Sequence, residues 1–191
     1  MQQPKRLIDL LAEQLLLLHA TNFYDCPVKN HTELFLANAK HNMQNGTYNK
    51  LLLKLSEARE NVTESGSIFA RMNWLQEKSN KDHFPDSFGY KSPEEAWAVI
   101  EAYGHLLQCN TLLHGDYCLP NIMLDDWRFS GFVDLDAGGV GDPHVDIFWM
   151  IWSLEYNFKT DKYRERFLDA YGRSKVNEDM LRLVAAVEVF G

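Results

Sequence analysis

Polar side chains able to do acid–base or metal chemistry gather between residues 114 and 136, and short apolar segments separate them. They are His114, Asp116, Asn121, Asp134 and Asp136. The intervening apolar runs at 122–124 and 132–133 predict strands, whereas a solvated charged helix face would not alternate in this way. Phosphoryl transfer needs such a set. A carboxylate accepts the proton of the attacking hydroxyl, and oxygen ligands hold Mg²⁺ against the phosphates.

The spacing of these residues fits that chemistry. Asp116 and Asn121 lie on one loop, five residues apart, so both side chains can face one cavity. Residues 125–128 have the composition of a hairpin turn between two strands. Pairing of 122–124 with 130–133 would return the chain to the same cavity and place Asp134 near Asn121. We therefore expect the three side chains to converge.

The segments HGDYCLPNIML and FSGFVDLDAGG resemble the catalytic loop and metal-binding segment of the aminoglycoside phosphotransferases, particularly the 3′-hydroxyl type. That family shares its fold with the protein kinases. The resemblance implies an ATP-dependent transferase, a kinase that confers antibiotic resistance. In it, Asp116 is the catalytic base. It also implies that Asn121 and Asp134 bind Mg²⁺.

Other residues of this region are expected to have structural roles. The resemblance matches Asp142 and Asp146 to the loop and helix that follow the metal segment. His114 is predicted to hydrogen-bond backbone near the metal segment, in preference to acting as a general base. Asp136 is open between a second metal contact and a loop cap, and His144 is expected at a helix start.

The C-terminal segment VEVFG resembles the family's acidic and aromatic C-terminus, which contacts the aminoglycoside. The resemblance implies that Glu188 binds substrate, and Asp82 and Asp86 lie in a polar loop where further carboxylates are expected. A small-molecule substrate follows, an aminoglycoside by resemblance. Choline-, homoserine- and sugar-type substrates stay open, because relatives acting on them share the catalytic loop.

The elements predicted to position this region are mostly helical. Apolar residues at helical spacing after Pro4 predict a first helix over 7–18, and Ser92, Pro93 and Glu95 form a capping-box start for a helix reaching about Gln108. Further helices are predicted at 32–44, 48–59, 66–78, 144–156, 160–172 and 177–190. Short strands are predicted at 111–114, 122–124 and 129–135, and residues 80–91 are predicted to form a loop.

The expected fold class is therefore α+β and mostly helical, with a short β-hairpin patch at residues 111–135. By resemblance it is the C-terminal lobe of a protein-kinase-like fold. The expected domain is a single unit, residues 1–191, with its catalytic loop at 114–121 and its metal segment at 134–138.

A kinase-like enzyme also needs an N-terminal lobe, with a small sheet and a lysine that fixes the phosphates. The sequence before Leu7 has no such elements. We therefore expect the N-terminal lobe to be absent, ATP affinity to be weak, and the truncated chain to be inactive alone. The face left uncovered by that lobe predicts a homo-oligomer.

Composition excludes several other classes. The formal net charge of −8, from 27 acidic and 19 basic side chains, argues against a nucleic-acid partner. Asp9 and Glu13 interrupt the apolar N-terminal segment, so it predicts an amphipathic helix, with neither a secretion signal nor a membrane segment. Three cysteines without a CxxC pair argue against a disulfide framework. A cytoplasmic location is expected.

Two alternatives remain from other functional classes. A metal-dependent phosphohydrolase would use carboxylates and imidazoles as ligands of two metals. Its candidate ligands are His114, Asp116, Asp134, Asp136 and His144. The other alternative is a non-catalytic lobe that binds cationic sugars through its acidic surface.

Overall fold

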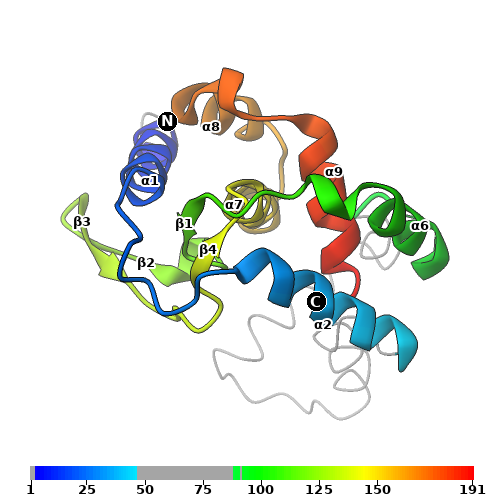
Figure 1. The fold of residues 1–191 in the computed structure, drawn as a ribbon. Coiled ribbons are helices and arrows are strands. Elements are labelled where there is room, and N and C mark those ends of the chain that lie inside the picture. The colour runs from blue at the N-terminus through cyan, green and yellow to red at the C-terminus, as the bar shows by residue number, and fades with distance from the viewer. Residues whose placement is uncertain (1–2, 47–87, 91) are drawn as a thin grey trace, which may run out of the picture. The chain divides into compact units, whose positions relative to one another are not determined.

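The computed structural model describes residues 3–46, 88–90 and 92–191 (Figure 1). The predicted helices 48–59 and 66–78 lie outside the described residues, as do Asp82 and Asp86. The described part confirms the expected class, a mostly helical α+β fold with small antiparallel sheets.

The described helices and strands follow one another in an order close to the predicted one. The helices are α1 (Gln3–His19), α2 (His31–Gln44), α6 (Pro93–Tyr103), α7 (His144–Phe158), α8 (Arg164–Tyr171) and α9 (Glu178–Glu188). The strands are β1 (Thr111–Leu113), β2 (Ile122–Asp125), β3 (Arg128–Phe132) and β4 (Gly139–Gly141). Each predicted helix within the described residues is found, with ends displaced by up to five residues. None of the described helices is both long enough and apolar enough to cross a membrane.

The chain separates into two compact units. The first comprises Met1–Leu34 and His105–Val184, and the second comprises Phe35–Gly104 and Ala185–Gly191. The first unit therefore contains α1, α7, α8 and all four strands, and with them the whole segment from 114 to 136. The prediction of a single domain stays a prediction.

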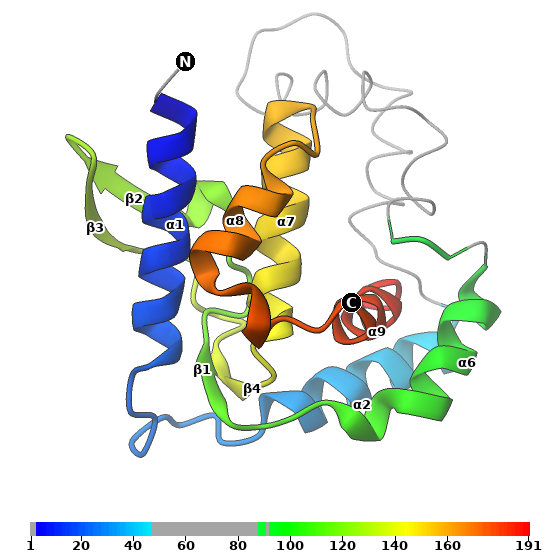
Figure 2. The ribbon, with the colours of Figure 1, turned by 90° about the horizontal axis from the view of Figure 1, so that it is seen from above.

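The core of the first unit forms where the apolar stripe of α1 packs against α7 and α8. Ile8, Leu11 and Leu15 recur at helical spacing and are buried together with Met150 and Phe167. Figure 2 shows α8 lying beside α1, and these two helices make extensive contact. Burial of each such side chain contributes roughly 1.5–3 kcal/mol, so this cluster fixes α1 against the helices that support the site.

The β2–β3 hairpin has the predicted pairing. Ile122 lies opposite Phe132 and Met123 opposite Gly131, with a register irregularity before Leu124. The turn residues Asp126 and Trp127 have φ values of 43° and 62°. Positive φ at both central positions is the conformation that matches the twist of a two-residue hairpin. The predicted turn at 125–128 is therefore confirmed.

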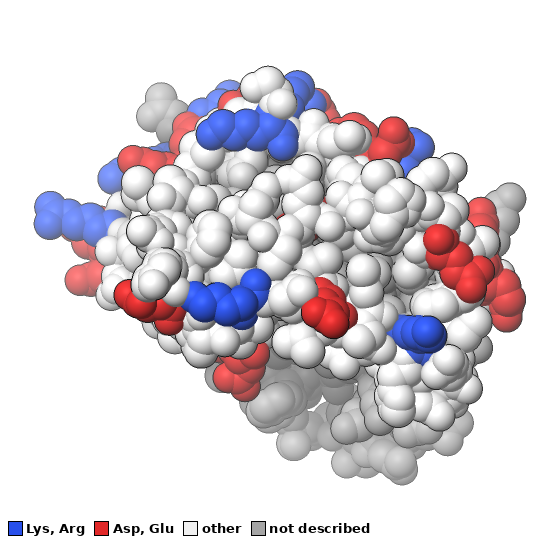
Figure 3. All heavy atoms as spheres, in the orientation of Figure 1, with Lys and Arg blue, Asp and Glu red and all other residues white. Residues whose placement is uncertain are grey.

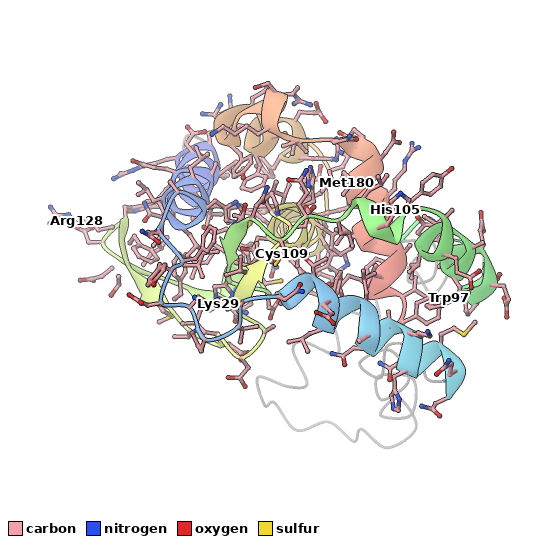
Figure 4. The ribbon with its side chains drawn as sticks, viewed as in Figure 1. Lys29, Trp97, His105, Cys109, Arg128 and Met180 are labelled. Atoms are coloured by element: carbon pink, nitrogen blue, oxygen red, sulfur yellow. The ribbon has the colours of Figure 1, made fainter. Side chains whose placement is uncertain are left out.

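The side chains at the hairpin tip point in different directions. The Arg6 guanidinium of α1 lies 5.2 Å from the Trp127 ring centroid, a cation–π contact between the turn and the first helix. Arg128 is exposed and points away from the hairpin (Figure 4).

The strand β4 was not predicted from the sequence. It is a Gly-Val-Gly segment, which carries little strand propensity, and it pairs antiparallel with β1 through Thr111–Gly141 and Leu113–Gly139. The strand is held from outside the sheet as well, because the Val140 N–H donates to the Val28 carbonyl at 2.8 Å. The thiol of Cys109, a residue labelled in Figure 4, donates to the Val140 carbonyl at 2.9 Å.

The second unit contains the predicted helix start at residues 92–95. The Ser92 hydroxyl accepts a hydrogen bond from the Glu95 N–H, and Pro93 occupies the first turn. The helix ends at Tyr103, five residues before the predicted end, and a turn of 3₁₀ helix follows at Gly104–Leu106. Within this unit the rings of Trp97 and Phe190 meet edge to face.

Candidate active site

The loop between β1 and β2, residues 114–121, carries two of the predicted site residues in direct contact. The Asn121 Nδ2 donates to the Asp116 carboxylate Oδ2 at 2.8 Å and to the Asp116 carbonyl at 3.0 Å. Asn121 is buried and Asp116 is half-buried. The amide therefore fixes the orientation of a carboxylate that still reaches the surface.

Two side chains of helix α7 hold the backbone of this loop, one near each end. The Asp146 carboxylate, fully buried, accepts the His114 N–H through Oδ2 and the Gly115 N–H through Oδ1, each at 2.8 Å. At the other end, the Leu119 N–H donates to the Ser153 hydroxyl at 2.9 Å. Asp146 lies in the first turn of α7, where the helix dipole favours a negative charge. Asp146 and Ser153 thus fix the loop backbone.

His114 is completely buried beneath the loop. Its Nδ1 accepts the Asp116 N–H at 3.3 Å, so its backbone contact lies within the catalytic loop, whereas the sequence pointed to the metal segment. Its ring packs edge to face against Tyr117 and Phe132. Among the described residues, its Nε2 has no hydrogen-bond partner. This position suits a supporting residue, because a general base must reach the substrate.

The metal segment returns to the loop as the hairpin pairing predicted. The Val133 N–H donates to the Asn121 carbonyl at 3.0 Å, which places the backbone of Asp134 one residue beyond this contact. Asp134 has a φ of 58°, in the left-handed region, and its side chain is exposed. Asp136 is exposed too, and no described residue makes a hydrogen bond or ion pair with either carboxylate.

A second contact joins the two segments at Gly115. A Cβ on this residue would lie 2.0 Å from the Ala137 carbonyl oxygen, and its φ is +87°. Only glycine fits there, since any side chain would collide with backbone in a conformation that already disfavours one. The catalytic loop and the metal segment therefore approach each other within contact distance.

The side chains present suit a hard cation. Asn121 uses its amide nitrogen on Asp116, which leaves Oδ1 as an oxygen donor, and Asp134 supplies an exposed carboxylate. Mg²⁺ prefers one or two carboxylates and completes its shell with water and phosphate oxygens. In the described part of the chain, no group of three or more His, Cys, Asp or Glu side chains could hold a metal.

The geometry does not support the phosphohydrolase alternative, because both ring nitrogens of His144 have partners. Nδ1 lies 2.7 Å from Asp142 Oδ1, and Nε2 accepts the Asn177 N–H at 3.0 Å. Asp142 also accepts the Gln108 N–H at 2.8 Å. Burial alone would raise the pKa of Asp142, but its hydrogen bonds with His144 and Gln108 outweigh burial and lower it. The pair fixes the start of α7.

Apolar side chains are exposed around the site, on the hairpin and the metal segment. They are Met123, Phe129, Val133 and Leu135. Self-association through this face stays a prediction. Figure 3 shows one face of the molecule, on which the acidic and basic side chains of the described residues are interspersed. Glu188, the last residue of α9, belongs to the second unit and is buried.

Comparison with known proteins identifies the class to which this fold and loop belong. A family model described as the phosphotransferase enzyme family matches residues 1–184, and the chain belongs to this family. A probable aminoglycoside 3′-phosphotransferase of Lactococcus lactis is 44% identical over 191 residues, all of this chain and 61% of that protein. An aminoglycoside 3′-phosphotransferase of Niallia circulans is 27% identical, covering 97% of this chain and 59% of that protein.

Solved structures agree with the fold. An aminoglycoside phosphotransferase of Streptomyces rimosus, in complex with ADP and streptomycin, matches with a TM-score of 0.66 at 20% identity. The match covers 96% of this chain and 61% of that one. The predicted resemblance is therefore confirmed, and this chain spans roughly three fifths of the length of the relatives it matches.

Proposed function

We propose that this chain carries the catalytic residues of an ATP-dependent aminoglycoside phosphotransferase. The reaction would transfer the γ-phosphate to a hydroxyl of the sugar. The observation that supports it most directly is the Asn121–Asp116 hydrogen bond of 2.8 Å, made beside the returning metal segment. It holds a surface-reaching carboxylate next to a second oxygen ligand, as phosphoryl transfer to a hydroxyl requires.

Asp116 is the base in this proposal. One of its carboxylate oxygens is engaged by Asn121, and the other can accept the proton of the attacking hydroxyl. Asn121 has two roles, since its Nδ2 orients Asp116 and its Oδ1 can hold Mg²⁺ together with Asp134. When bound, Mg²⁺ would neutralise the charge of the phosphate oxygens.

The aminoglycoside is proposed from the relatives and from charge. The relatives from Lactococcus lactis and Niallia circulans are named for aminoglycoside 3′ phosphorylation, and the Streptomyces rimosus structure contains streptomycin and ADP. A chain of net charge −8 suits a cationic sugar. Glu188, Asp82 and Asp86 remain the candidate substrate carboxylates. An antibiotic-resistance role in the cytoplasm belongs to the same proposal.

Because the 191-residue chain is expected to be inactive alone, transfer of labelled phosphate from ATP to kanamycin tests the proposal on a chimaera that joins this chain to the part of the Lactococcus lactis relative outside the match. Asp116→Asn should reduce the rate by about 10²–10⁴-fold, because it removes the proton acceptor. Asp125→Asn is the matched control, since Asp125 is an exposed carboxylate at the hairpin tip and should leave the rate unchanged. Equal rates in the wild type and Asp116→Asn would contradict the assignment of the base.

Binding measurements separate this proposal from a lobe that only binds sugars. We expect weak Mg-ATP binding and measurable kanamycin binding by calorimetry, and Mn²⁺ in place of Mg²⁺ can be followed by electron paramagnetic resonance. Loss of Mn²⁺–ADP binding in Asn121→Ala would support the metal assignment. Kanamycin binding without any nucleotide or Mn²⁺ binding would favour the non-catalytic alternative.

A further inference from the structure

His19 lies at the end of α1, far along the sequence from the catalytic loop, yet it contacts the residue that holds that loop. Its Nε2 is 3.1 Å from Asp146 Oδ2, and its Nδ1 is 2.8 Å from the Tyr171 hydroxyl of α8. The His19 side chain is 6% exposed, and the Asp146 side chain is not exposed at all. These three side chains form a buried chain of hydrogen bonds from α8 to α7.

Tyr171 and Asp146 contact the two different ring nitrogens of His19. Burial, together with the nearby Asp146 and Asp142 carboxylates, raises the pKa of Tyr171 to about 12. The phenol therefore stays protonated near neutral pH and can donate to His19 Nδ1. The Asp146 carboxylate can only accept, so the hydrogen between it and His19 lies on Nε2, which donates to Asp146.

Asp146 consequently accepts three hydrogen bonds, from three different parts of the first unit. Two come from the His114 and Gly115 N–H groups, and the third comes from His19, on the same Oδ2 that binds His114. A buried carboxylate needs several donors to offset its lost hydration. Without His19, Asp146 would depend on the two loop amides alone, and its carboxylate could rotate.

From these contacts we infer that His19 is a positioning residue for the catalytic loop, acting through Asp146 and held in place by Tyr171. It orients the carboxylate that fixes His114 and Gly115, the two residues directly before Asp116. The contribution to transfer rests on the proposed function, whereas the effect on the loop does not. A displacement of the base by about 1 Å is enough to slow such a reaction strongly.

Amide hydrogen exchange of the 191-residue chain, followed by NMR, tests the effect on the loop. In His19→Leu, exchange of the His114 and Gly115 N–H groups should become faster by about tenfold or more, because a hydrogen bond to a charged group is lost. The Val133 N–H, bonded to the Asn121 carbonyl, is the internal reference and should change little. Equal acceleration at Gly115 and Val133 would overturn the inference.

His19→Gln is the rescue variant, because its side-chain amide can donate to Asp146 and accept from Tyr171. It should restore slow exchange at Gly115, and exchange as fast as in His19→Leu would overturn the inference. Should His19→Leu fail to fold, Tyr171→Phe decides the question. It should accelerate Gly115 exchange more than Tyr163→Phe, a control beside the same helix whose hydroxyl has no hydrogen-bond partner among the described residues. Equal exchange in both variants would overturn it.

The kinetic readout separates this inference from the proposed function. In the chimaera with the Lactococcus lactis relative, His19→Leu should lower kcat for kanamycin about tenfold with KM nearly unchanged, and His19→Gln should restore kcat. A rise in KM without a change in kcat would overturn the role of His19 in positioning the base. If Asp116→Asn has no effect on transfer, the proposed function fails, while the exchange measurements still decide whether His19 holds the loop.

Discussion

The catalytic loop at 114–121 and the metal segment at 134–138 are proposed to act on the same ligand, but the protein holds them differently. The loop is anchored from beneath by Asp146 and Ser153 of α7, and the Tyr117 hydroxyl donates to the Leu11 carbonyl of α1 at 2.8 Å. The metal segment is exposed, and its described contacts are made by backbone at Val133, Gly138 and Ala137.

This difference indicates what each segment contributes. A base must be in place before the substrate hydroxyl arrives, so a loop fixed by buried hydrogen bonds is pre-organised for proton transfer. A carboxylate that binds a metal gains its fixed position from the cation itself, because the ion supplies the opposite charge. We therefore expect changes in the loop to alter stability and changes in the metal segment to alter ligand binding.

Gly115→Ala should have the largest effect. It places a Cβ within 2.0 Å of the Ala137 carbonyl at a φ of +87°, so either the loop or the metal segment must move. We expect the free energy of unfolding to fall by about 3 kcal/mol or more, measured by urea denaturation. The control is Gly131→Ala, where a Cβ would have nothing within 4 Å. Similar losses in both variants would contradict the proposed close approach.

Asp142→Asn tests the hydrogen bonds that hold the start of α7, the helix whose side chains anchor the loop. It weakens hydrogen bonds with Gln108 and His144 and should cost about 2 kcal/mol at neutral pH. The pKa of Asp142 is lowered from 3.8, so its stabilising contribution is complete above about pH 3.8 and is lost as the pH falls through the folded-state value. The stability difference between wild type and variant should therefore shrink in strong acid. A stability difference that grows on acidification would show that the Asp142 carboxylate destabilises the folded state.

Ser153→Ala removes the second anchor of the loop and should have a smaller effect. The Leu119 N–H loses its acceptor, at a cost of about 1 kcal/mol. The melting temperature should fall accordingly, and phosphate transfer by the chimaera should slow as the loop loosens. Thr160→Ala is a control, because Thr160 follows the end of α7 and its hydroxyl accepts, among the described residues, a hydrogen bond only from the nearby Lys162 N–H. A melting temperature no lower than that of this control would show that Ser153 does not hold the loop.

Asp134→Asn should have the smallest effect on stability and a clear effect on binding, because asparagine tolerates the left-handed φ of 58° at this position. The exposed carboxylate has no hydrogen bond from the described residues, so the free energy of unfolding should change by about 0.5 kcal/mol or less. Mn²⁺ affinity in the presence of ADP should fall by about tenfold or more, measured by electron paramagnetic resonance. Unchanged Mn²⁺ affinity would remove Asp134 from the proposed metal ligands, and a large loss of stability would contradict the comparison of the two segments.

The sequence by itself determined the features that depend on neighbours along the chain. The spacing of Asp116 and Asn121 predicts a shared loop, and the apolar segments on either side of residues 125–128 predict the hairpin. The helix start at Ser92 follows from side-chain hydrogen bonding within one turn. These signals are local, so they could be read without knowing the packing. The strand β4 escaped prediction because its Gly-Val-Gly sequence forms a strand through its partner β1 and through Val28.

Only the tertiary structure decided how the loop is held. His19 lies 127 residues from Asp146 and 152 residues from Tyr171, and the pattern of α1 showed little more than an apolar stripe. Hydrophobic packing brings such helices together without specifying which polar side chains will meet. The burial that follows makes those contacts strong, because buried charges and donors must satisfy one another. The sequence thus identified the residues proposed for the chemistry, and the packing of α1, α7 and α8 determined what fixes them in place.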